Sequence, residues 1–243
     1  MQWIAHRGVS AIAPENTLAA FRQAIALGAD GIEFDVQRSQ EGALVVFHDA
    51  TLERTTDGQG PLREQTLTEL KRLDAGSWFD PQFASERIPT LVEVLECCQA
   101  HNLRLYPEIK ATQDWTRAQV QELAVLFDSK MWRDRTTFCA FDAVFLDQLH
   151  QLAPALEVAY CVSSLEQYQK VWPKVQDDGS GKVVLSIADD LIAVHPHWLT
   201  AAQAKHIPVL VWTVNEPVRQ QQLQRLGVAG IITDEVSAHS LAP

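Results

Sequence analysis

Long apolar segments are missing from this chain. No run approaches the roughly 20 apolar residues that a membrane-spanning helix needs, and the hydrophobic content of 47% is that of an ordinary globular protein. The first residues, MQWIAHRG, have neither the basic region nor the apolar region of a secretory signal. We therefore expect a cytoplasmic protein without stable membrane association.

Basic residues are also scarce. The chain has 20 Lys and Arg against 31 Asp and Glu, which gives a formal net charge of -11. Nucleic acids and anionic membranes are bound largely through basic patches, so this balance argues against both as partners. An anionic small molecule would need a metal ion or a few placed cations to bind.

Cysteine is rare and poorly spaced for a structural role. The four cysteines include one adjacent pair and no CxxC motif, which argues against a zinc site and against a disulfide framework. The sequence also has no low-complexity tract, no repeat of fixed period and no linker. We therefore expect a single domain over residues 1–243 with reduced cysteines.

Short strand-like runs alternate with amphipathic helical stretches, such as residues 16–28, 90–102 and 216–227, and this is the pattern of an α/β fold. Eight strands, each followed by a helix, predict a (β/α)8 TIM barrel, and 243 residues suit one. The stretch ADDLIAVHPHW, within residues 177–200, fits either a loop or a helix. The predicted strands are residues 3–7, 31–36, 104–110, 136–141, 157–162, 182–187, 208–214 and 230–233.

A ninth strand-like run, LVVFHD at residues 44–49, does not fit this count. Only about seven residues separate it from Val36, whereas a parallel crossover needs roughly a dozen or more. Residues 39–42, SQEG, are turn formers, so the run is predicted to return as an antiparallel hairpin arm. This arm would bring His48 back to the carboxyl ends of the barrel strands.

A long segment, residues 50–88, follows this hairpin and carries only one short helical pattern, at residues 67–73. Loops of this length are uncommon in compact domains unless they are functional. We expect the segment to form a small inserted subdomain after the second barrel strand, above the barrel mouth.

Three acidic residues are predicted to meet at that mouth. Glu33 and Asp35 share one face of their strand because side chains alternate with a period of two. Glu108 joins them from the next barrel strand, since barrel active sites lie at the carboxyl ends of the strands. Clustered carboxylates raise one another's pKa unless a cation binds, and their hard oxygen atoms suit Mg²⁺ or Ca²⁺. The alternative is that these acids only form ion pairs with Arg7 or Lys110.

The same rule selects further residues at the strand ends, which are His6, Arg7, Lys110, Trp212 and Asp234. Two histidines, His6 and His48, would supply an acid and a base near neutral pH. With a divalent cation and two fixed positive charges, they suit a phosphodiester, whose charge must be neutralised as a pentacoordinate phosphorus forms.

Each of these residues also has a structural alternative. His6 could be a hydrogen-bonded core residue and His48 a turn cap, while Trp212 could serve packing and Asp234 could cap a helix. The other six histidines lie away from the strand ends and are predicted to be structural; they are His101, His150, His195, His197, His206 and His239.

Taken in order, the motifs of the chain resemble those of the glycerophosphodiester phosphodiesterases. They run from the first predicted strand to the last, and the length of the chain is similar to that of the short, cytosolic bacterial members. The motifs are HRG (6–8), PENT (14–17), GADGIEFDVQRSQEG (28–42), VVFHD (45–49), LERTTDGQG (52–60), LDAGSWF (73–79), IPTLVEVL (88–95), EIK (108–110), WTVN (212–215) and GVAGIITD (227–234).

The resemblance implies a barrel with a small inserted subdomain that helps to bind glycerol. It implies one divalent cation, Mg²⁺ or Ca²⁺, held by Glu33, Asp35 and Glu108, and a catalytic pair formed by His6 and His48. It further implies substrate or site contacts from Arg7, Asn16 and Lys110.

The activity implied by the resemblance is hydrolysis of small glycerophosphodiesters, such as glycerophosphocholine or glycerophosphoethanolamine, to sn-glycerol 3-phosphate and an alcohol. One alternative is a cyclising phospholipase or phosphodiesterase of similar barrel architecture, although the chain lacks a membrane-docking stretch. The other is a non-catalytic phosphate-binding barrel, which would have no need of two histidines.

Two finer predictions concern individual positions. In the insertion, Trp78 and Phe79 are expected to form an apolar wall for the glycerol skeleton, or else to pack within the insertion itself. Pro107 precedes Glu108 in a barrel strand, where it removes a backbone donor. We therefore expect Pro107 to disturb the strand pairing beside it and to leave the Glu108 carboxylate in place.

Overall fold

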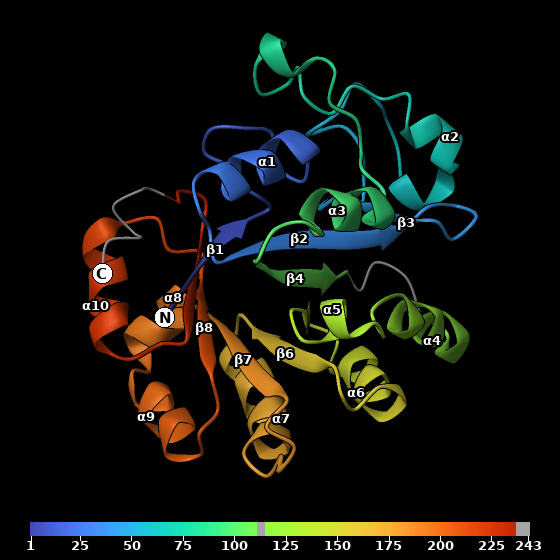
Figure 1. Ribbon diagram of the computed structural model, residues 1–243. Helices are drawn as coiled ribbons and strands as arrows, with labels where there is room; N and C mark the ends of the chain where they lie inside the picture. Colours follow the sequence, from blue (N-terminus) through green and yellow to red (C-terminus); the bar gives the residue numbers. More distant parts are fainter. Residues whose placement is uncertain (111–114, 237–243) are drawn as a thin grey trace.

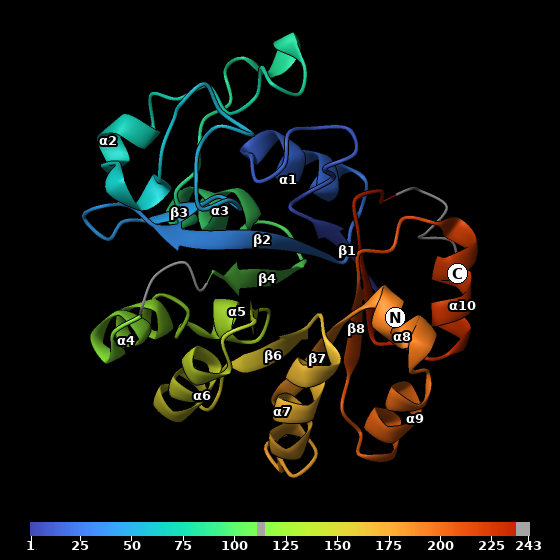
Figure 2. The same cartoon turned by 180° about the vertical axis from the view of Figure 1, so that it is seen from behind.

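Eight parallel strands close into a barrel, because β1 (Gln2–His6) pairs with both β2 (Gly31–Arg38) and the last strand, β9 (Gly230–Thr233). The computed structural model describes residues 1–110 and 115–236. Helices between the strands cover the outside of the barrel (Figures 1 and 2). The predicted (β/α)8 TIM barrel is confirmed. From β9 the order around the barrel continues through β8 (Val209–Trp212), β7 (Val183–Ala188), β6 (Glu157–Val162), β5 (Thr137–Ala140) and β4 (Arg104–Ile109) to β2.

Most of the longer helices begin at a Ser, Thr or Asp whose side chain accepts a backbone hydrogen bond, as Thr90 does before α3. The stretch ADDLIAVHPHW contributes to two helices, α8 and α9, rather than to a loop. The helices outside the insertion are α1 (Leu18–Ala26), α3 (Leu91–Cys98), α4 (Arg117–Leu126), α5 (Lys130–Arg133), α6 (Ala143–Leu152), α7 (Leu165–Val175), α8 (Asp189–Val194), α9 (His197–Ala204) and α10 (Pro217–Arg225).

Alternation along the strands separates two cores. On β2, Ile32 and Phe34 belong to the large cluster that lies between the strands and the helices. Ile4 and Cys139 instead belong to a smaller cluster inside the barrel, although the residues directly before and after each of them in the sequence lie in the outer cluster. Glu33 and Asp35 share the inward side of β2 because they alternate with the outward apolar residues.

The hairpin predicted after β2 is present. Strand β3 (Leu44–Val46) pairs with β2 in antiparallel fashion, with Val46 opposite Val36. Buried Gln37 then fixes the chain beyond β3, because its side-chain amide donates to the carbonyl groups of Phe47, His48 and Asp49 at 2.8, 3.1 and 2.7 Å. His48 is thereby held beside the barrel strands, as the hairpin argument required.

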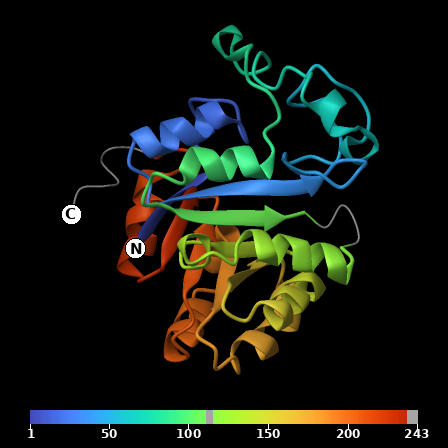
Figure 3. The ribbon, with the colours of Figure 1, turned by 45° about the vertical axis from the view of Figure 1, so that its right-hand side comes forward.

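Residues 50–88 form an excursion with a small hydrophobic cluster of its own, which includes Leu52, Leu62 and Leu70 and extends to Phe47. Its short helical turns are η1 (Leu62–Glu64), α2 (Leu67–Leu70) and η2 (Pro81–Phe83). Figure 3 shows α2, in cyan, at the end of the barrel to which the arrowheads of β2 and β4 point. The excursion therefore lies at the end where a barrel carries its active site.

Pro107 weakens one side of β4 only. Towards β2 the strand pairs over six residues, and Asp35 stands opposite Glu108. Towards β5 the ladder contains one pair, Glu108 with Cys139. Leu105 donates its backbone N–H to Arg135 on the β5 side, so Pro107, two residues later, lacks its donor on that same side. The proline thus leaves the register of the acidic residues intact.

Candidate active site

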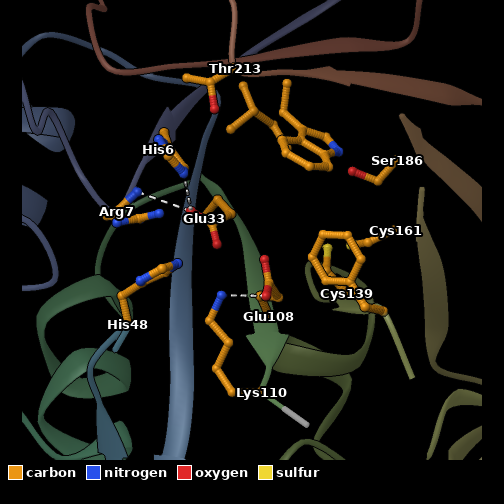
Figure 4. Close-up of a pocket in the computed structure, with 13 residues that line it drawn as sticks. His6, Arg7, Glu33, His48, Glu108, Lys110, Cys139, Cys161, Ser186 and Thr213 are labelled. Carbon is orange, nitrogen blue, oxygen red and sulfur yellow. Dashed lines mark hydrogen bonds and ion pairs between the residues drawn. The ribbon is translucent and has the colours of Figure 1, made fainter. Parts of the chain in front are cut away.

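A cavity with a volume of about 160 Å³ opens among the carboxyl ends of the strands. Figure 4 shows charged side chains on one side of it and Ser186, Cys139 and Cys161 on the other. Seven of the residues selected from the sequence line this cavity, namely His6, Arg7, Glu33, His48, Glu108, Lys110 and Trp212.

Three carboxylates meet beside the cavity. Oxygen atoms of Glu33, Asp35 and Glu108 all lie within 4.8 Å of one another. Glu33 and Asp35 are only 4% and 1% exposed, so water does little to separate their charges. Asn16 fixes one of the acids from the first βα loop, because its side chain donates to Asp35 at 2.7 Å and accepts the Asp35 backbone N–H at 3.2 Å.

The three acids differ in how far nearby positive charges offset the effect of burial on their pKa. Burial opposes ionisation of Asp35, but Lys110 at 2.7 Å and Arg7 at 3.4 Å outweigh it and lower the pKa of that carboxyl. Burial raises the pKa of Glu108 in spite of its bond to Lys110. Burial, and then the charge of Asp35, raise the pKa of Glu33 to about 8. Ion pairing therefore accounts for Asp35 and in part for Glu108, whereas the charges of His6 and Arg7 near Glu33 do not offset its burial.

Glu33 is also incompletely hydrogen-bonded. Its Oε2 atom accepts the backbone N–H of Arg7 at 3.0 Å and lies 4.0 Å from Nε2 of His6. Its Oε1 atom is buried and has no hydrogen-bond partner among the described residues. A buried oxygen without a partner beside two further carboxylates is a donor set that fits a hard divalent cation.

His6 is held by an acidic partner. Its Nδ1 donates to Asp234 at 2.6 Å, and Asp234 in turn accepts hydrogen bonds from Asn215 at 2.6 Å and Ser10 at 2.9 Å. Burial disfavours the charged imidazole, but the bond to Asp234 and the charge of Glu33 prevail and raise the pKa of His6. Asp234, which sequence reasoning could also explain as a helix cap, here orients His6 and leaves Nε2 on the side of Glu33.

His48 has a matching partner in the next residue. Its Nδ1 lies 2.6 Å from Asp49, and Arg54 donates to the same carboxylate at 2.6 Å. The bonds from Arg54 lower the pKa of Asp49 to about 2. A pairing of Nδ1 with a carboxylate orients the ring and leaves Nε2 for a reacting group. His6 and His48 therefore share the same arrangement, with Nδ1 bound to an aspartate and Nε2 unbound by it.

The two substrate contacts predicted in the insertion, Trp78 and Phe79, do not line the cavity. Trp78 and Phe79 pack against each other with ring centroids 5.6 Å apart, and Phe79 also packs on Phe83. The Trp78 indole N–H donates to Ala75 within the insertion. This packing matches the structural alternative given for the two rings and does not bring them to the cavity.

Sequence reasoning missed Phe141 and Ser186, which do line the cavity. Phe141 packs edge-on against Trp212, with centroids 5.7 Å apart, so the two rings form an aromatic wall of the cavity. Phe141 directly follows a strand, so the strand-end rule could have found it. Ser186 lies within β7, where the residues before and after it in the sequence are apolar. Of the six remaining histidines, His239 lies outside the described residues and the other five do not line the cavity.

The model of the Glycerophosphoryl diester phosphodiesterase family matches residues 6–238. The chain belongs to this family. The resemblance stated from the motifs is thus confirmed, and with it the prediction of a phosphodiesterase enzyme.

Relatives within the glycerophosphoryl diester phosphodiesterase family match nearly the whole chain. It is 33% identical to the glycerophosphodiester phosphodiesterase of Caldanaerobacter subterraneus subsp. tengcongensis, over 96% of this chain and 93% of that protein. It is also 33% identical to glycerophosphodiester phosphodiesterase 1 of Rattus norvegicus, over 87% of this chain and 71% of that protein.

Solved structures of the family have the same fold. The glycerophosphodiester phosphodiesterase of Agrobacterium tumefaciens matches with a TM-score of 0.82 and 26% identity over the full length of both chains. A phosphodiesterase of Oleispira antarctica, solved in complex with the product sn-glycerol-3-phosphate, matches with a TM-score of 0.82 and 29% identity over 99% of this chain and 96% of that one. Across residues 1–110 and 115–236, no helix combines the length and the apolar character needed to cross a membrane.

Proposed function

We propose that this enzyme hydrolyses glycerophosphodiesters to sn-glycerol 3-phosphate and a free alcohol, with a divalent cation held by Glu33, Asp35 and Glu108. The observation that carries the proposal is that Glu33 and Glu108 line one cavity together with two carboxylate-bound histidines, while Asp35 lies beside them in the same carboxylate cluster. The product bound to the Oleispira antarctica relative supports the same chemistry.

Arg7 and Lys110 balance the charge of the bound phosphodiester. Both side chains line the cavity, and both are already held beside Asp35, at 3.4 and 2.7 Å. When bound, a divalent cation adds positive charge that offsets the charge growing on the phosphate oxygens. The fixed cations require no reorganisation as the pentacoordinate phosphorus forms.

His6 and His48 carry the proton transfers. One takes the proton of the attacking oxygen, and the other delivers a proton to the leaving alcohol. Both rings bind a carboxylate through Nδ1, which keeps that proton in place and presents Nε2 for the transfer. The bond between His6 and Asp234 and the bond between His48 and Asp49 thus fix the tautomer that each role requires.

The cavity favours a small substrate. Its volume of about 160 Å³ is below the roughly 300–1,000 Å³ typical of pockets for drug-sized ligands. Phe141 and Trp212 form an apolar wall suited to a short carbon skeleton. These features favour a deacylated glycerophosphodiester, such as glycerophosphocholine or glycerophosphoethanolamine, over an intact phospholipid.

The proposal is tested by measuring release of sn-glycerol 3-phosphate from glycerophosphocholine. The protein is first stripped with a chelator and then assayed with no metal, with Mg²⁺ and with Ca²⁺. We expect turnover only after a divalent cation is restored. Full turnover by the stripped protein in excess chelator would refute the metal assignment, and no product with either cation would refute the substrate assignment.

A further inference from the structure

Ser186 and Trp212 give two polar groups to the apolar side of the cavity. Among the described residues within strands β5 to β8 that line it, these two carry side-chain N–H or O–H groups, and Thr213, directly after β8, adds a further hydroxyl. Their neighbours on this side include Cys139, Cys161 and Phe141. Ser186 is 1% exposed and stands on β7 between Cys161 of β6 and Leu210 of β8. Figure 4 shows Ser186 across the cavity from Arg7 and Lys110.

The Trp212 indole N–H is buried and has no hydrogen-bond acceptor among the described residues, Ser186 included. Leaving a buried donor without an acceptor is unfavourable, so such groups in native structures call for an explanation. The edge-on packing of Phe141 against the indole, at 5.7 Å, limits the movement of that ring. A buried and constrained donor, on a residue that lines the cavity, is suited to bind a ligand atom.

We propose that Ser186 and Trp212 form a subsite that binds one hydroxyl group of the polyol part of the substrate. This inference rests on the proposed function, since the charged side of the cavity is assigned to the phosphate. The carbon skeleton attached to that phosphate then extends towards the opposite side, where these two groups lie.

The chemistry of the two groups selects an alcohol. The indole N–H only donates, whereas the serine hydroxyl both donates and accepts. A substrate hydroxyl accepts the bond from Trp212 and at the same time donates to Ser186. A deoxy analogue, with hydrogen in place of that hydroxyl, can neither accept the bond from Trp212 nor donate to Ser186. It would leave both protein groups buried without hydrogen-bond partners. The subsite therefore distinguishes a glycerol diester from its deoxy analogues.

The test combines protein variants with substrate analogues. Ser186→Ala and Trp212→Phe each remove one polar group and keep most of the packing. Each is assayed with glycerophosphocholine and with the two analogues that lack one glycerol hydroxyl, the phosphocholine diesters of propane-1,2-diol and propane-1,3-diol. We expect kcat/KM for glycerophosphocholine to fall about 3- to 10-fold in each variant, the effect of losing one neutral hydrogen bond. With one of the two analogues the loss should disappear.

Two matched controls separate substrate recognition from general packing. Thr136→Val and Trp115→Phe also remove a buried hydroxyl and a buried indole N–H that have no partner among the described residues. Neither Thr136 nor Trp115 lines the cavity. We expect both controls to keep the wild-type ratio of kcat/KM between glycerophosphocholine and its analogues.

The assay distinguishes loss of the hydroxyl subsite from absence of the hydrolysis itself. If the wild type releases no product from glycerophosphocholine, the proposed function fails. If the wild type is active, equal losses with all three substrates, or no loss in Ser186→Ala and Trp212→Phe, would overturn the subsite and leave the hydrolysis in place.

Discussion

Arg54, in the inserted segment, donates two hydrogen bonds to Glu15 of the first βα loop, with N···O distances of 2.7 and 2.8 Å. The same guanidinium donates to Asp49 at 2.6 and 3.0 Å. Glu15 also accepts a hydrogen bond from the Arg7 side chain at 2.7 Å. An unbroken series of alternating charges thus links His48, through Asp49, to Arg7. The insertion is thus joined to Asp49 and Glu15, which are the acidic partners of His48 and Arg7.

We predict that Arg54 positions His48 and Arg7. Arg54→Gln should lower kcat/KM for glycerophosphocholine by about 10-fold, because charge-assisted bonds to two carboxylates are lost, although the half-exposed site weakens each of them. Arg54→Lys should recover part of the loss by restoring the charge. Arg63→Gln, at an exposed arginine of the same insertion, is the control and should match the wild type. Activity within twofold of wild type in Arg54→Gln would exclude a positioning role.

The metal site should be sensitive to loss of a single carboxylate. Glu33→Gln and Glu108→Gln are expected to weaken Mg²⁺ or Ca²⁺ binding at least 10-fold, measured by titration calorimetry. The Tm of the stripped protein should change little, since each variant replaces an acid of raised pKa with a neutral amide of similar shape. Glu122→Gln, on the exposed face of α4, controls for net charge. Unchanged affinity in both site variants would place the metal elsewhere.

The two histidines should separate catalysis from metal binding. His6→Ala and His48→Ala are each expected to lower kcat by about 10² to 10⁴, the range for removal of one general acid or base. Metal affinity should stay near that of the wild type, and wild-type kcat should show a bell-shaped dependence on pH. His197→Ala, at an exposed residue of α9, should leave kcat unchanged. Near-normal turnover in either site variant would remove that histidine from the proton transfers.

Asp49 should contribute to stability in a defined pH range. Its pKa is 3.8 ordinarily and about 2 in the folded protein, where Arg54 binds it. Because folding lowers this pKa, the contribution is complete above the ordinary value and is lost as the pH falls towards 2. The Tm of the wild type should therefore exceed that of Asp49→Asn at pH 6, and the gap should close progressively below pH 4. Asp177→Asn, at an exposed position, should show a smaller gap. A gap that stays constant down to pH 2.5 would contradict the role of the Asp49 charge.

Much of the barrel and of the charged site follows from the sequence alone, for a local reason. Side-chain alternation along a strand is a property of the backbone, so GIEFDV was sufficient to place Glu33 and Asp35 on one face. Parallel strands closed into a barrel carry their carboxyl ends to one rim, which brings in His6, Glu108 and Asp234. The short spacing between β2 and β3 required a hairpin, and this returned His48 to the site.

Tertiary structure alone decided which loops meet and which side chains face the cavity. The bond between Arg54 and Glu15 joins residues 39 positions apart, and no local periodicity relates two irregular segments. Trp78 is an aromatic residue in the segment expected to hold glycerol, yet it packs within that segment, because burial against its neighbours satisfies its ring and its N–H. Ser186 resembles an ordinary core serine in the sequence, and only closure of the barrel shows that its strand turns it towards a cavity. Sequence periodicity fixes the direction of a side chain relative to its own strand, whereas the identity of what it faces depends on the packing of the whole chain.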